Sequence, residues 1–125
     1  MKKEFSELSN KVLGCAIEVH KVLGPGLLES AYQICLVHEL KLNNINFETE
    51  LSLPVIYKGI KLDCGYRIDF FIDKTVILEL KSVDNILGIH EAQLLTYMKL
   101  MNVKQGLLIN FNVKLLKNGI KSFVL

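Results

Sequence analysis

The sequence has little cysteine and little proline, and it has no long apolar run. Its three cysteines, Cys15, Cys35 and Cys64, are too few and too scattered for a disulfide framework, and none forms the C-x-x-C pair that would indicate a zinc site. The two prolines are isolated, so no proline-rich linker divides the chain. No apolar run reaches the roughly 18 residues of a membrane span, and the charged start is not followed by the apolar region of a signal peptide. We therefore expect a cytoplasmic protein that has no membrane partner.

Several catalytic loops are also absent from the sequence. No G-x-x-x-x-G-K-S/T or G-x-G-x-x-G segment follows a predicted strand, so a phosphate-binding loop of either kind is unsupported. No G-x-S-x-G element indicates a serine hydrolase. These absences remove the commonest nucleotide-binding and acyl-transfer classes from consideration.

The composition of the chain is typical of one packed globular domain. The chain has 125 residues, of which 50% are hydrophobic and 22% are charged. Its mean hydropathy is +0.32, which supports a core and argues against disorder. We expect a single domain over residues 1–125, because the length does not leave room for two.

The spacing of apolar residues predicts three helices and several strands. Helical spacing begins at Phe5, continues to residue 23 and stops at Gly24-Pro25-Gly26, and it recurs at about 27–42 and 89–101. A period of two indicates strands between these helices and after them. The predicted strands are 47–57 (with Pro54 near an edge or bulge), 60–62, 66–72, 76–81, 106–111 and 120–125. This order predicts an α/β or α+β domain with one central sheet.

Two carboxylates and a lysine alternate with apolar residues on two neighbouring strands. Glu79 and Lys81 share one face of the strand 76–81, because residues i and i+2 point the same way. On the preceding strand Asp69 lies on the face opposite to the apolar residues Ile68, Phe70 and Ile72.

The register of these two strands follows from matching their apolar faces across a hairpin. Phe70 is then opposite Leu78, and Asp69 is opposite Glu79. This pairing requires a three-residue turn at 73–75 or a bulge, because a two-residue turn would send the carboxylates to different faces.

Paired carboxylates repel each other unless a cation lies between them. Oxygen ligands on a rigid sheet suit a hard divalent ion such as Mg²⁺, and Lys81 is placed to hold a water or offset negative charge. The alternative is an exposed polar face carrying a Glu–Lys pair, and spacing alone leaves both interpretations open.

Three segments resemble motifs of one enzyme superfamily. Asp69 followed by Glu79-Leu80-Lys81 resembles the D…(D/E)-x-K signature of the PD-(D/E)XK nucleases. Residues 26–32, Gly-Leu-Leu-Glu-Ser-Ala-Tyr, resemble the motif of its GxxExxY family, and residues 93–97, Gln-Leu-Leu-Thr-Tyr, resemble the Q-x-x-x-Y motif of its exonuclease-like branches. Ile68 stands where the superfamily name has proline, a position that varies among relatives.

The resemblance implies a fold and a set of site residues. The fold would be a restriction-endonuclease-like αβββαβ core with a mixed central sheet flanked by helices. Asp69, Glu79 and the carbonyl of Leu80 would bind Mg²⁺ or Mn²⁺, and Glu29 would contribute directly or through water. Lys81 would orient the attacking water.

Gln93 and Tyr97 lie at i and i+4, so both can face the site from one helix. Each of these residues also has a purely structural interpretation. A carboxylate such as Glu29 is favoured at any helix N-terminus, Gln93 could lie on the polar face of its helix, and Tyr97 could pack in the core. His20 and Arg67 are weaker candidates for contacts with a substrate phosphate. A cap or core role for His20 and a structural ion pair for Arg67 are the alternatives.

We therefore expect a Mg²⁺-dependent nuclease that acts on nucleic acid, with DNA favoured. The alternatives are a non-catalytic module that binds nucleic acid or protein, and hydrolysis of another phosphate ester. A homo-oligomer could build a substrate groove from two subunits.

The distribution of charge bears on the substrate surface. The net charge is +2, but residues 92–125 contain no acidic residue and five lysines: Lys99, Lys104, Lys114, Lys117 and Lys121. We expect some of these lysines to line a shallow surface for a phosphate backbone, and simple solubility is the alternative.

Overall fold

The computed structural model describes residues 6–125, so the predicted apolar position Phe5 lies outside the described part. The elements in chain order are α1 (Glu7–Leu23), α2 (Glu29–Leu42), β1 (Phe47–Ser52), β2 (Val55–Tyr57), β3 (Ile60–Leu62), β4 (Arg67–Ile72), β5 (Val76–Lys81), α3 (Gly88–Met101), β6 (Gln105–Asn110), the 3-10 helix η1 (Leu116–Gly119) and β7 (Ile120–Val124). The series α2-β1-β4-β5-α3-β6 confirms the predicted αβββαβ order. No helix in residues 6–125 is long and apolar enough to cross a membrane.

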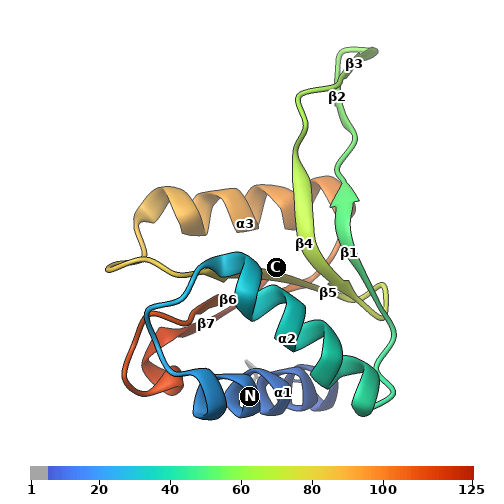
Figure 1. The fold of residues 1–125 in the computed structure, drawn as a ribbon. Coiled ribbons are helices and arrows are strands. Elements are labelled where there is room, and N and C mark those ends of the chain that lie inside the picture. The colour runs from blue at the N-terminus through green and yellow to red at the C-terminus, as the bar shows by residue number, and fades with distance from the viewer. Residues whose placement is uncertain (1–5) are drawn as a thin grey trace.

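A five-stranded sheet lies between two layers of helices (Figure 1). Its order is β1-β4-β5-β6-β7, and it is mixed, because β5 and β6 are parallel while the other neighbours are antiparallel. One apolar cluster joins α1 and α2 to sheet residues such as Phe70, Leu78 and Ile109. A second cluster joins α3 to residues such as Ile77 and Leu108 on the other face. The predicted fold class is confirmed.

The first helix ends where the sequence predicts, and within the described residues it begins at Glu7 after an N-cap at Ser6. The Ser6 hydroxyl accepts the backbone N–H of Ser9 at 3.1 Å, which satisfies a free donor in the first turn of α1. The helix ends at Gly24, whose φ of 68° suits a glycine far better than a residue with a side chain. Between them Val12, Ala16 and Val19 are buried against the sheet cluster.

The prediction of one strand over 47–57 in a single sheet is wrong. The strand is interrupted at Leu53-Pro54, between the end of β1 and the start of β2. β2 and β3 pair only with each other and form a separate two-stranded sheet. Proline has no N–H to donate, so the ladder of β1 does not continue through it. Residues 53–66 form an arm that projects from the sheet (Figure 1), and the Leu53 N–H donates to the Tyr66 carbonyl at its base at 2.9 Å.

Smaller differences concern boundaries and one side chain. The second helix starts at Glu29, because Leu28 is still extended with a ψ of 152°. Ile68 is buried as expected, but it packs in the cluster under α3 with Leu53 and not with Phe70.

Candidate active site

The site begins where β4 and β5 separate. The two strands pair from Phe70↔Leu78 to Ile72↔Val76 around a three-residue turn, which confirms the predicted register. Beyond Phe70, β4 stays paired with β1 as far as Arg67, while β5 stays paired with β6 as far as Lys81. Figure 1 shows β1 and β4 rising together toward the arm and away from β5. A gap in backbone pairing therefore opens between Asp69 and Glu79.

The two carboxylates fill this gap by taking over backbone hydrogen bonds. The Asp69 N–H donates to Glu79 Oε1 at 3.2 Å, and the Leu80 N–H donates to Asp69 Oδ2 at 2.8 Å. Each acid thus bonds the opposite strand at the place where the ladder is missing. The prediction that Asp69 and Glu79 meet across the hairpin holds in the structure.

Burial makes this pair unusual electrostatically. Glu79 is only 6% exposed, and burial together with the neighbouring charge of Asp69 raises its pKa to about 9. Burial also raises the pKa of Asp69, and the charges of Glu50 and Glu29 add to that effect. Lys81 acts in the opposite direction by lowering the pKa of Glu79. Burial and the neighbouring carboxylate therefore both favour the protonated form of Glu79 when no cation is bound.

Glu29 is the first residue of α2 and is exposed. Its charge contributes to the raised pKa of Asp69, so the two side chains are within electrostatic reach. The preceding loop is tied to the end of β5, because the Ser82 hydroxyl donates to the Leu27 carbonyl at 2.6 Å. This bond brings the start of α2 to the carboxylate pair.

The tyrosine of the segment 26–32 explains how that loop is held. The Tyr32 hydroxyl donates to the Gly24 carbonyl at 2.6 Å and accepts the Leu27 N–H at 3.1 Å. The buried Tyr32 ring stacks on Phe111, with centroids 4.4 Å apart and planes 11° from parallel. Gly26 has a φ of 96° in the turn between these bonds. Gly26 and Tyr32 therefore fix the loop that positions Glu29, which lies between them in the sequence.

Sequence reasoning missed Glu50, an acid on β1. It stands in the register between Thr49↔Phe70 and Leu51↔Ile68, and thus opposite Asp69. Its φ of 50° is rare for a glutamate, and Gln33 of α2 donates to its Oε1 at 3.0 Å. No local pattern indicates this residue, because the β1–β4 pairing spans the whole arm.

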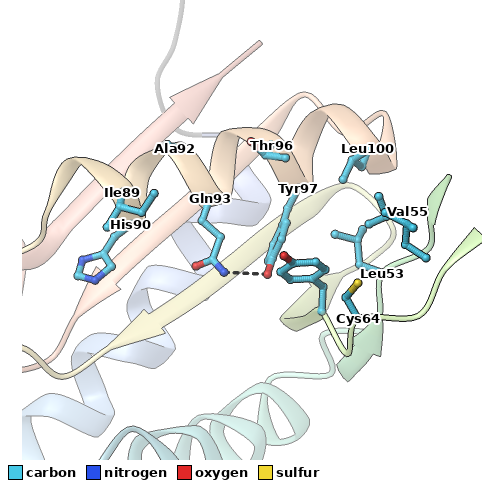
Figure 2. A pocket seen from close by; sticks show the side chains of 12 residues that line it. Leu53, Val55, Cys64, Ile89, His90, Ala92, Gln93, Thr96, Tyr97 and Leu100 are labelled. Atoms are coloured by element: carbon cyan, nitrogen blue, oxygen red, sulfur yellow. Dashed lines mark hydrogen bonds between the residues drawn. The ribbon is translucent and has the colours of Figure 1, made fainter. Parts of the chain in front are cut away.

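The opposite wall of the site comes from α3. Gln93 Nε2 donates to the Tyr97 hydroxyl at 2.9 Å (Figure 2), which confirms that the two side chains share one helix face. Tyr97 is buried, and burial and the charges of Glu79 and Asp69 raise its pKa. The helix thus brings Gln93 and Tyr97 beside the carboxylates.

Lys81 ends β5 and is half-buried next to Asn110 of β6. Asn110, a second residue that sequence reasoning missed, is buried and fixes the chain after Lys81. Its Oδ1 accepts the Val83 N–H at 3.1 Å and its Nδ2 donates to the Val83 carbonyl at 2.9 Å. A polar residue at the end of an apolar strand is the signal that indicates such a role.

His20 and Arg67 make other hydrogen bonds. The His20 ring is buried and bonds the Val113 carbonyl through Nε2 at 2.8 Å, beside a cleft that Lys21 also lines. Arg67 is exposed and donates to Ser52 Oγ at 2.9 Å across the β1–β4 pair. Their contact with a substrate phosphate stays a prediction.

The donor set at the strand gap suits a hard divalent ion. Across residues 6–125, no three His, Cys, Asp or Glu side chains gather closely enough to hold a metal by themselves. The gap supplies two carboxylates, which is the number that Mg²⁺ commonly takes from a protein when water and phosphate complete its shell. Burial is the main cause of the raised pKa of both acids, and neighbouring carboxylates add to it, namely Asp69 for Glu79, and Glu50 and Glu29 for Asp69.

Comparison with known proteins identifies the family. A family model of the PD-(D/E)XK nuclease superfamily matches residues 6–123, which is almost the whole chain. No curated protein and no solved structure gives a significant match. The matched range contains every residue of the strand gap and of the facing helix α3. The chain therefore belongs to the PD-(D/E)XK nuclease superfamily.

Proposed function

We propose that this protein is a Mg²⁺- or Mn²⁺-dependent nuclease of the GxxExxY group that hydrolyses phosphodiester bonds, with DNA as the favoured substrate. One observation carries the proposal: Asp69 and Glu79 exchange hydrogen bonds with the opposite strand at the point where β4 and β5 part. Superfamily membership supports nuclease chemistry at this place. The hydrogen bonds of Tyr32 around Glu29 support the assignment to the GxxExxY group.

Asp69, Glu79 and the Leu80 carbonyl would hold the ion, with Glu29 contributing directly or through water. When bound, the ion stabilises negative charge on the phosphate as a Lewis acid. Lys81 is one pleat from Glu79, so its ammonium group can donate to the attacking water and hold it in place. Gln93 and Tyr97 orient the substrate from the opposite wall through the amide and the hydroxyl.

Cleavage by matched variants tests the proposal. We expect wild-type protein to cleave DNA with Mg²⁺ or Mn²⁺, and Glu79→Gln and Lys81→Ala to lose about 100-fold or more of the rate. Asp73→Asn in the β4–β5 turn and Lys41→Ala at the end of α2 are the controls, because both residues are exposed. Full activity in Glu79→Gln would point to a contaminating nuclease and refute the site.

The alternative function is a non-catalytic module that binds nucleic acid or protein. One observation favours it: among residues 6–125 no three His, Cys, Asp or Glu side chains gather closely enough to hold a metal by themselves. Saturating Mg²⁺ or Mn²⁺ separates the two, because an ion that binds only the folded protein raises its thermal stability. Unchanged stability, together with tight binding of uncleaved DNA, would support the alternative.

A further inference from the structure

A pocket of about 520 Å³ lies between one face of α3 and the arm, next to the candidate active site. The arm contributes apolar side chains, among them Leu53 and Val55. The helix contributes the apolar side chains of Ile89, Ala92 and Leu100 and polar side chains, among them His90, Gln93 and Thr96 (Figure 2). The volume falls within the range of sites that hold small molecules in proteins.

The pocket and the strand gap share two residues of α3. Gln93 and Tyr97 line the pocket, and the same two residues form the wall that faces the carboxylates. The charges of Glu79 and Asp69 help to raise the pKa of the Tyr97 hydroxyl, so the carboxylate pair lies within electrostatic reach of that wall. The pocket therefore adjoins the place where phosphate is proposed to react.

The walls suit a flat ring that has polar edges. Tyr66 is 47% exposed and stands edge-on to Tyr97, with ring centroids 6.4 Å apart and planes at 67°. Its ring is therefore available for stacking, and the side chains of His90, Gln93 and Thr96 offer hydrogen-bonding groups. The lining residues include no aspartate or glutamate, and the nearest acids that act on the pocket wall are the proposed metal ligands Glu79 and Asp69.

We propose that this pocket holds one unstacked nucleobase of the strand whose phosphate lies at Asp69 and Glu79. The proposal rests on the proposed function and deepens it, because it names the substrate class. A base inside a closed duplex must be unpaired and unstacked before it can enter. Single-stranded nucleic acid and frayed ends are therefore the preferred substrates, and intact duplex is disfavoured.

Binding to two labelled oligonucleotides in EDTA tests the pocket without cleavage. One is a single strand, and the other is a dumbbell duplex of related sequence whose two ends are closed by non-nucleotide linkers, so that it offers no unpaired base. We expect tighter binding of the single strand, and Tyr66→Ala should weaken it by about 5- to 150-fold, the range of base–aromatic stacking. Tyr66→Phe keeps the ring and should bind as wild type does. Tyr57→Ala is the matched control, because Tyr57 is an exposed tyrosine of the same arm outside the pocket.

The exposed Cys64 gives a second readout that needs no variant. It lines the pocket, so a bound base should slow its alkylation by iodoacetamide. The single strand should protect Cys64 and the dumbbell should not. Cys35, which is half-buried and outside this pocket, is the internal control and should react equally in both.

The outcomes separate the pocket from the proposed function. Equal binding of both oligonucleotides, with Cys64 unprotected, would overturn the pocket even if Glu79-dependent cleavage is found. So would a Tyr66→Ala effect on self-association without any effect on single-strand binding, since the pocket would then hold a second copy. Selective protection of Cys64 in a protein that never cleaves would uphold the pocket and refute the nuclease.

Discussion

Asp69 and Glu79 define the site because each replaces a backbone hydrogen bond that the diverging strands cannot make. Their burial beside each other is unfavourable for two negative charges, which explains why Glu79 has a raised pKa. This residue-scale arrangement was predictable, because two apolar strands joined by a short turn have few possible registers. Glu50 was not predictable, because its place depends on pairing between segments separated by the arm.

The raised pKa of Glu79 predicts a pH dependence of stability in metal-free protein. The pKa is about 9 in the folded state and near 4.5 in the unfolded state, so unfolding between these values releases a proton. The contribution of Glu79 to the free energy of unfolding should therefore be greatest below about pH 4.5 and fall as the pH rises toward 9. We expect the free energy of unfolding to drop by about 2–4 kcal/mol from pH 5 to pH 8 on this account.

Glu79→Gln should remove most of that slope, because an amide imitates the protonated acid without titrating. Denaturant unfolding in EDTA at the two pH values measures the effect. Asp73→Asn, in an exposed turn, should retain the wild-type slope. An unchanged slope in Glu79→Gln would show that Glu79 is ionised at pH 8 in the folded protein.

At the scale of elements, the site depends on where strands and helices end. The carboxylates lie where β4 leaves β5, Lys81 ends β5, and Glu29 begins α2. The helices and the β4–β5 hairpin follow from local periodicity and could be predicted. The arm could not, because residues 55–57 continue the strand pattern of 47–52 and only Pro54 marks the break.

The hydrogen bonds of the Tyr32 hydroxyl to the loop between α1 and α2 should contribute to stability. Tyr32→Phe keeps the stacking on Phe111 but removes the bonds to the Gly24 carbonyl and the Leu27 N–H. We expect a loss of about 1–3 kcal/mol of stability, since both backbone groups lose a buried partner. Thermal and denaturant unfolding measure it.

Tyr57→Phe, on the exposed arm, should leave the stability within about 0.5 kcal/mol of wild type. Equal stabilities for Tyr32→Phe and wild type would show that the hydroxyl does not hold the loop that presents Glu29.

Across the whole molecule, the lysines of residues 92–125 do not form one surface. Lys121 pairs with Glu91 at 2.7 Å, and Lys104 precedes β6 at the end away from Lys81. Lys114 and Lys117 follow β6 at the same end as Lys81 and line a cleft with Lys21. A phosphate-backbone surface at this cleft stays a prediction, as does a groove built by two copies of the chain. The sequence predicts the excess of positive charge in residues 92–125, but where these lysines lie on the surface depends on the fold.

We propose Asp69 and Glu79 as the metal site of a nuclease. A crystal structure with Mn²⁺ tests this site most directly, because the anomalous signal of manganese locates the ion independently of the protein density. We expect one strong peak between the two carboxylates, within bonding distance of both, and its loss in crystals of Glu79→Gln. An ion bound elsewhere, or an empty strand gap at millimolar Mn²⁺, would contradict it.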